Sequence, residues 1–84
     1  MAFNLTFADN SWNEYHEAEK KDRETIDKLI KSILRNNPVQ QPEALKYNYS
    51  GWFSLKINKK DRLIYRIVDN SAEIISCKGH YDDK

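Results

Sequence analysis

Aliphatic residues in the middle of the chain recur with the spacing of an α-helix, and this stripe constrains the fold more than any other feature. They fall at i, i+3, i+4, i+7 and i+8 and comprise Ile26, Leu29, Ile30, Ile33 and Leu34. The sequence Asn36-Asn37-Pro38 then ends the pattern. The stripe has to be buried, so the rest of the chain must supply an apolar surface that covers it.

Residues 37–51 contain two prolines, several amides and Gly51 with little periodicity, so a long irregular connection is predicted there. The segments after this connection alternate between apolar and polar residues, as β-strands do. Polar breaks at 58–61 and 69–71 indicate hairpin loops. Strands are therefore expected at about 52–57, 62–68 and 72–78. A further, half-buried strand near the amino terminus is predicted from the alternation of Phe3, Leu5 and Phe7.

A shorter helix is predicted between the first strand and the aliphatic helix. Ser11 and Glu14 form a capping-box pattern, in which Ser11 caps the helix and Glu14 reaches back. The helix should run from Trp12 to about Lys20, and Asp22 can cap the next one. The order β-α-α-β-β-β predicts an α+β fold, with two helices packed on one face of an antiparallel sheet.

The lengths of the hairpin loops decide which side chains share a face, because facing residues of an antiparallel pair point the same way. An odd first loop places the apolar residues of both strands toward the helices. It also places Lys56 and Arg62 together on the opposite face. An odd second loop adds Ser76, Lys78 and His80 to that face, so Lys56, Arg62 and His80 are predicted to meet there.

Bulk properties exclude several classes of protein. The 84 residues predict a single domain, 1–84, and no apolar run approaches the roughly 18 residues of a membrane span. The one cysteine, Cys77, excludes an internal disulfide and fits a reducing cytoplasm; its place in a strand predicts a buried thiol. The formal net charge is +1, with −2 over residues 1–43 and +3 over residues 44–84, so any phosphate-binding face belongs to the carboxyl half.

Candidate site residues lie in the second half of the chain. They comprise one carboxylate, three cations and one imidazole: Glu43, Lys46, Lys56, Arg62 and His80. Cleavage of an RNA phosphodiester needs these groups, since a base deprotonates the 2′-hydroxyl, an acid protonates the leaving oxygen, and cations hold the phosphorane charge. Two histidines without clustered cysteines or carboxylates give no metal-site pattern. Each residue taken alone is better explained as a solvated surface residue.

Several short motifs carry a resemblance to a known family. They occur in the order S-W-N-E-Y at 11–15, K-L-I-K at 28–31, P-E-A-L-K at 42–46, S-G at 50–51, R-L-I-Y-R at 62–66 and H-Y at 80–81. In this combination the chain resembles the YoeB/Txe family of the RelE superfamily. Members of that family are ribosome-dependent mRNA interferase toxins, paired with YefM/Axe-type antitoxins. The resemblance covers nearly the whole chain and implies a RelE-like fold.

The resemblance also implies a role for each candidate residue. Glu43 is expected to be the general base, His80 the general acid and Arg62 the group that stabilises the pentavalent phosphate. The implied RNA contacts are Lys46, Lys56 and Tyr81. Because the RNA's own 2′-hydroxyl attacks, no metal or cofactor is implied. The family pattern has an arginine where this chain has Lys56, and it ends at His-Tyr, whereas Asp82-Asp83-Lys84 follow here.

The implied partners are a YefM/Axe-like antitoxin, the ribosome with its mRNA, and operator DNA only through the antitoxin. A homodimer is a further expectation, and no membrane is implied. Two other functions remain open at this point. One is a non-catalytic ParE-like toxin that binds DNA gyrase. The other is a pure interaction module built on exposed aromatic residues: Trp12, Tyr47, Tyr49 and Trp52.

Overall fold

The computed structural model describes residues 4–8, 10–37 and 39–79. Its elements are β1 (Asn4–Phe7), α1 (Ser11–Glu17), α2 (Lys20–Leu34), β2 (Glu43–Ala44), the 3₁₀-helix η1 (Tyr47–Tyr49), β3 (Phe53–Lys56), β4 (Arg62–Val68) and β5 (Ser71–Ser76). The α+β class and the predicted order of the main elements are confirmed. The short strand β2 and the helix η1 are additions, in a segment for which the sequence predicted only an irregular loop.

The strands of the described residues form one sheet, in the order β1-β5-β4-β3-β2. The pairs β2–β3, β3–β4 and β4–β5 are antiparallel, whereas β1 lies parallel to β5 at the edge. The sheet is therefore mixed, and the prediction of a wholly antiparallel sheet was wrong for β1. This strand is joined to the others through two helices and not through a hairpin, so no tight turn forces it to run antiparallel.

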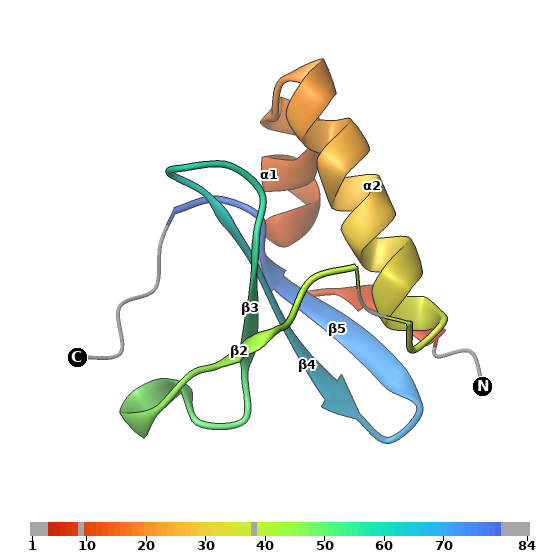
Figure 1. Cartoon of the computed structure of the whole chain (residues 1–84), viewed down its shortest axis with the longest axis vertical. Helices are drawn as coiled ribbons and strands as arrows, with labels where there is room; N and C mark the ends of the chain where they lie inside the picture. Colours follow the sequence, from red (N-terminus) through yellow and green to blue (C-terminus); the bar gives the residue numbers. More distant parts are fainter. Residues whose placement is uncertain (1–3, 9, 38, 80–84) are drawn as a thin grey trace.

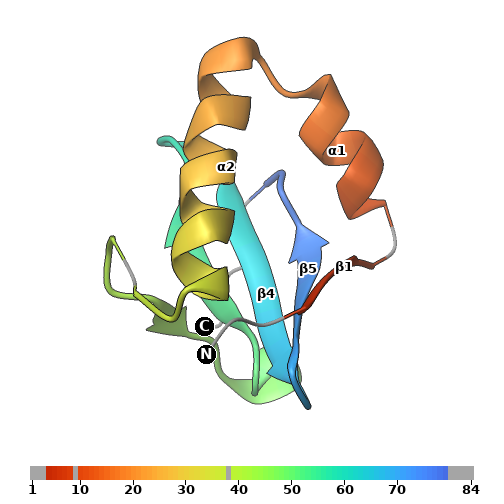
Figure 2. The same ribbon diagram turned by 90° about the vertical axis from the view of Figure 1, so that its right-hand side faces the viewer.

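The main core lies between the helices and the sheet. Both helices cover the same face, and η1 lies at the opposite end of the molecule from α1 (Figures 1 and 2). The core contains the predicted helical stripe and the inward residues of the strands: Ile26, Leu29, Ile30, Ile33, Leu55, Ile57, Leu63, Tyr65, Ala72, Ile74 and Cys77. Leu34 is only partly buried and packs at its margin. The stripe is thus core, as its spacing predicts.

A second, smaller cluster covers part of the face away from the helices. It consists of Leu45, Ile64 and Ile75, with Tyr49 and Trp52 packed against it. Ile64 has no exposed surface, although its position two residues after Arg62 places it on the helix-free face. The segment after β2 supplies the cover, since Leu45 is itself 4% exposed. This second cluster holds the loop segment against the sheet beside the candidate site.

The hairpin between β3 and β4 has the predicted register. Phe53 faces Tyr65, Leu55 faces Leu63, and Lys56 faces Arg62. The loop between the two strands is odd in length, because it runs from residue 57 to residue 61. The prediction that Lys56 and Arg62 share the helix-free face is confirmed.

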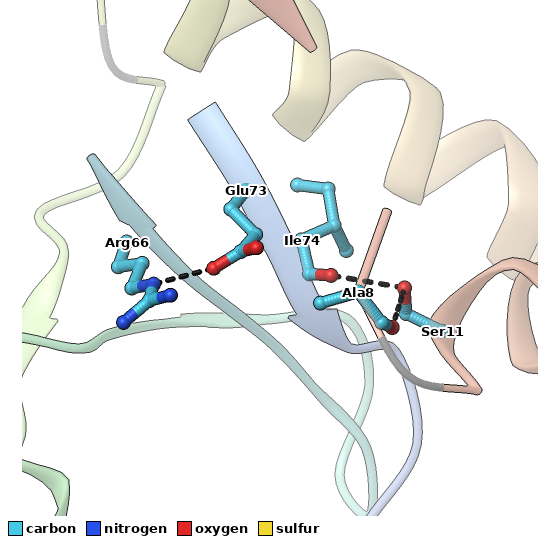
Figure 3. Close-up of polar contacts among 5 residues, drawn as sticks. All are labelled: Ala8, Ser11, Arg66, Glu73 and Ile74. Carbon is cyan, nitrogen blue, oxygen red and sulfur yellow. Dashed lines mark hydrogen bonds and ion pairs between the residues drawn. The ribbon is translucent and has the colours of Figure 1, made fainter. Parts of the chain in front are cut away.

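The hairpin between β4 and β5 differs from its prediction. Its loop has two residues, because Val68 faces Ser71, and Asp69 adopts a φ of 55°, a left-handed conformation that Asp tolerates. Arg66 and Glu73 therefore face each other and form an ion pair (Figure 3). The register then shifts beyond Tyr65, so that Ile64 faces Ser76. A β-bulge, and not an odd loop, therefore sets the register at the end of β5. The prediction that Ser76 and Lys78 join Lys56 and Arg62 on the helix-free face was wrong, because the Ser76 hydroxyl bonds to Glu14 of α1 and Lys78 lines a pocket beside the helices.

The helix starts also differ from the capping patterns in the sequence. Asn10 occupies the N-cap of α1, and Ser11 is already inside the helix. The Glu14 carboxylate does not reach back; it accepts hydrogen bonds from the Cys77 backbone N–H at 2.9 Å and from the Ser76 hydroxyl at 3.2 Å. The Glu14 carboxylate therefore bonds to the backbone N–H of the residue after β5, and not to the N-cap backbone as a capping box requires. Helix α2 begins at Lys20, so Asp22 lies in its first turn and does not cap it.

Ser11 joins α1 to the sheet and provides a test of this packing. Its side chain is fully buried, and its Oγ lies 2.7 Å from the Ala8 carbonyl oxygen and 2.9 Å from that of Ile74 (Figure 3). Both carbonyls also accept backbone N–H groups, from Ser11 and Ala8 respectively, so neither loses its last partner when the hydroxyl is removed. We therefore expect Ser11→Ala to lower the free energy of unfolding by about 1 kcal/mol, measured by urea denaturation. The exposed Ser50, changed to alanine, is the control; an equal effect of the two would contradict the expectation.

Candidate active site

A pocket opens on the helix-free face where β2, β3 and the start of β4 meet. Its volume is about 310 Å³, and its lining is polar: Gln40, Gln41, Glu43, Ser54, Lys56 and Arg62. Three of the residues predicted to form a site, Glu43, Lys56 and Arg62, therefore border one cavity. They come from three different strands, so the sheet itself holds them together.

Strand pairing explains this convergence. Glu43 faces Ser54 across β2–β3, and Lys56, two residues beyond Ser54, faces Arg62 across β3–β4. Side chains two residues apart on a strand share a face, and directly facing residues have Cβ atoms about 4.5–5.5 Å apart. One carboxylate therefore lies on the same surface as two cations. Such a surface can accept a proton on one side of a bound phosphate and balance negative charge on the other.

Gln40 holds the end of β3 in a way the sequence did not indicate. Its side-chain amide donates to the Lys56 carbonyl oxygen at 3.1 Å and accepts the Lys56 backbone N–H at 2.8 Å. The amide thus continues the ladder of β3 beyond β2, which is only two residues long. A single glutamine within a polar loop carries no sequence signal for this role, because the contact depends on the path of the loop.

The Arg62 guanidinium is anchored through one of its nitrogens. Nη1 donates to the carbonyl oxygens of Asn58 at 2.7 Å and Asp61 at 3.1 Å, both in the loop between β3 and β4. Within residues 4–8, 10–37 and 39–79, Nε and Nη2 have no hydrogen-bond partner. Since Arg carries five N–H donors, three of them have no partner among these described residues.

The other predicted site residues either lie outside this pocket or lie outside the described residues. Lys46 is exposed and occupies the N-cap of η1, three residues beyond Glu43, and it does not line the pocket. His80 and Tyr81 lie outside the described residues. The last described residue, Gly79, accepts a hydrogen bond on its carbonyl oxygen from the Arg62 backbone N–H at 2.9 Å. The residue before His80 is therefore hydrogen-bonded to the first residue of β4.

Cys77 is a structural residue, as predicted. It is 4% exposed, and burial, together with the nearby charge of Glu14, raises the pKa of its thiol to about 12. The thiol is therefore protonated at neutral pH and is a poor nucleophile. No group of three or more His, Cys, Asp or Glu side chains in the described part of the chain is arranged to hold a metal ion. No helix there is long and apolar enough to cross a membrane.

The aromatic residues considered as an interaction surface divide into two groups. Trp12 and Tyr47 are 53% and 76% exposed. Tyr49 and Trp52 instead pack against the second cluster, with ring centroids 5.4 Å apart. The expectation that all four are exposed was therefore wrong for Tyr49 and Trp52, which support the loop that carries Glu43.

Comparison with known proteins identifies the family. The model of the YoeB-like toxins of bacterial type II toxin-antitoxin systems matches residues 7–81. The chain belongs to this family. A YoeB toxin from Synechocystis is 40% identical over 82 residues, covering 92% of this chain and 95% of that toxin. Family membership favours the YoeB assignment over the ParE-like alternative.

Solved structures of YoeB proteins have the same fold. The YoeB dimer from Staphylococcus aureus is 38% identical and superposes with a TM-score of 0.81, covering 96% of this chain and 100% of that one. The YoeB–YefM complex from the same organism has the same identity and coverage, with a TM-score of 0.79. The mixed sheet with two helices on one face is thus the architecture of YoeB toxins.

Proposed function

We propose that this YoeB-family toxin is a ribosome-dependent endoribonuclease that cleaves mRNA in the ribosomal A site. The observation that carries the proposal is the convergence of Glu43, Lys56 and Arg62 around one open, polar pocket. An open pocket with a polar, charged lining suits an RNA backbone better than an apolar metabolite.

The reaction assigned to this site is an internal transfer at phosphorus. Glu43 takes the proton of the 2′-hydroxyl, and the 2′-oxygen forms a bond to the adjacent phosphorus. The bond from phosphorus to the 5′-oxygen breaks, and His80 gives that oxygen its proton. The products are a 2′,3′-cyclic phosphate and a 5′-hydroxyl. The RNA supplies the nucleophile, so the reaction as proposed requires neither a metal ion nor a cofactor.

Cations and an aromatic ring complete the proposed site. Arg62 stabilises the pentavalent phosphate with its three available N–H groups, and Lys56 contacts the same phosphate as a point charge. Lys46, exposed beyond Glu43, binds the RNA backbone outside the pocket. Tyr81 orients the substrate or stacks on a base. A YefM-like antitoxin would neutralise the toxin and carry the contacts to operator DNA, and a homodimer is proposed by similarity to the S. aureus YoeB dimer.

The test is in vitro translation with the purified protein, followed by primer extension on a defined mRNA. Wild-type protein is expected to cut at A-site codons only when ribosomes are present. His80→Ala should slow these cuts about 10²–10⁴-fold, because it removes the general acid. His16→Ala, on the exposed face of α1, is the matched control and should cut normally.

The outcomes separate the two candidate functions. Cuts that persist in His80→Ala would support the proposed nuclease activity but exclude His80 as its general acid. A wild-type protein that makes no cuts would overturn the nuclease and direct attention to a gyrase-binding, ParE-like activity.

A further inference from the structure

Gly79 is held at both ends of its backbone by two consecutive residues. Its N–H donates to Oδ1 of Asp61 at 2.9 Å, and its carbonyl oxygen accepts the Arg62 backbone N–H at 2.9 Å. Asp61 and Arg62 stand where the loop between β3 and β4 ends. The residue that precedes His80 is thus fixed to the same corner of the molecule as the Arg62 guanidinium.

Asp61 is itself held in place by the loop. Its Oδ2 accepts a hydrogen bond from the Asn58 side-chain amide at 3.2 Å. The Asn58 carbonyl oxygen Oδ1 in turn accepts the backbone N–H groups of Lys60 at 2.7 Å and Asp61 at 2.8 Å. The hydrogen bond from Gly79 is the main reason why the pKa of Asp61 is lowered below its ordinary value. The carboxylate is therefore charged at neutral pH, and a charged acceptor binds an N–H more strongly than a neutral one.

The backbone conformation of Gly79 favours glycine at this position. Its φ is 84°, in the left-handed region that glycine adopts at little cost. A side chain at this position would meet nothing within 4 Å, so packing does not require the glycine. The left-handed backbone conformation requires the glycine instead, and the two hydrogen bonds hold Gly79 in that conformation.

We propose that Asp61 is a positioning residue for His80, acting through its hydrogen bond to the Gly79 N–H. This inference rests on the proposed function of His80 as general acid. Without the carboxylate, Gly79 can adopt many alternative conformations, so we expect the general acid one residue later to align less well with the leaving oxygen. Asp61 does not itself contact the RNA or transfer a proton.

A purely structural role of Asp61 is the competing explanation, and the leaving group distinguishes the two. In an mRNA with a bridging sulfur in place of the 5′-oxygen at the cleaved bond, the leaving thiolate needs no protonation, so the general acid is bypassed. A defect that acts through His80 should disappear with this substrate. A defect caused by general misfolding of the site should remain.

The experiment compares Asp61→Ala, Asp61→Asn and His80→Ala in single-turnover cleavage of ribosome-bound mRNA. With the natural oxygen, Asp61→Ala should be slower by about 10- to 100-fold, in keeping with a misplaced catalytic group. Asp61→Asn keeps an acceptor oxygen and should lose no more than about 3-fold. With the bridging sulfur, both Asp61→Ala and His80→Ala should return to within about 3-fold of wild type. Glu24→Ala, which removes an exposed carboxylate from α2, should match wild type on both substrates.

Two results would overturn the positioning role: an Asp61→Ala variant that cleaves the natural substrate normally, or one whose defect persists on the sulfur substrate. A wild-type protein that cuts neither substrate would overturn the proposed function, and the proposal that Asp61 positions His80 would fail with it. Amide hydrogen exchange separates these failures. Faster exchange at Gly79 in Asp61→Ala would support the contact itself, and unchanged exchange would refute it.

Discussion

Replacing Glu43 with glutamine is expected to slow cleavage of ribosome-bound mRNA by about 10²–10⁴-fold, the usual contribution of a general base. Glutamine has nearly the same shape but cannot take the 2′-hydroxyl proton. Glu43 is exposed and makes its backbone pairing with Ser54 through β2, so the substitution should leave the fold intact. The measurement is a single-turnover cleavage rate, with circular dichroism and the melting temperature recorded for the same sample.

Glu24→Gln is the matched control, because it makes the same change at an exposed position on α2, away from the pocket. It should cleave at the wild-type rate. Both variants should still bind a YefM-type antitoxin, which separates lost chemistry from a lost fold. Cleavage by Glu43→Gln within about threefold of wild type would exclude Glu43 as the base.

The central part of the site is predictable from the sequence because β-strands have a strict period of two. Once the apolar residues of β3 and β4 are assigned to the helix side, Lys56 and Arg62 must share the other face, and the observed pairing of these two residues confirms this. The aliphatic stripe of α2 is predictable for a similar reason, since its period of 3.6 residues admits one buried face.

Features that depend on long-range contacts were not predictable. The S-W-N-E pattern fits a capping box, yet Glu14 instead accepts the Cys77 N–H, a group 63 positions away in the chain. The bulge near Ile75 and the parallel direction of β1 likewise leave no local pattern. The local capping preference is worth only about 1 kcal/mol, so tertiary contacts can override it.

The loop that carries Glu43 illustrates the same limit. Its amides and prolines predict irregular backbone, but Leu45 buries itself over Ile64, and Gln40 bonds to both backbone groups of Lys56. These contacts give a fixed position to a carboxylate that the sequence could only place in a loop. A lone leucine and a lone glutamine have no periodicity, so neither contact could be anticipated.

Arg62→Lys should reduce the cleavage rate by about 10²-fold, close to the effect of removing one donor that stabilises a transition-state anion. Lysine keeps the positive charge but offers no planar fork, so it cannot hold two phosphate oxygens at once. It also loses the paired contacts of Nη1 with the carbonyl oxygens of Asn58 and Asp61. Because Lys56 already occupies the facing position, the variant would leave the pocket with two point charges and no guanidinium.

Arg66→Lys is the control that separates chemistry from strand stability. Arg66 lies on the same strand, is exposed, and pairs with Glu73 outside the pocket, so this change should lower the free energy of unfolding by no more than about 1 kcal/mol and leave cleavage unchanged. Single-turnover rates and urea unfolding of both variants give the comparison. If Arg62→Lys lost cleavage only in proportion to its unfolded fraction, Arg62 would be a structural residue of the β3–β4 loop. A loss of about 10²-fold in a fully folded variant would instead assign the guanidinium to the phosphate.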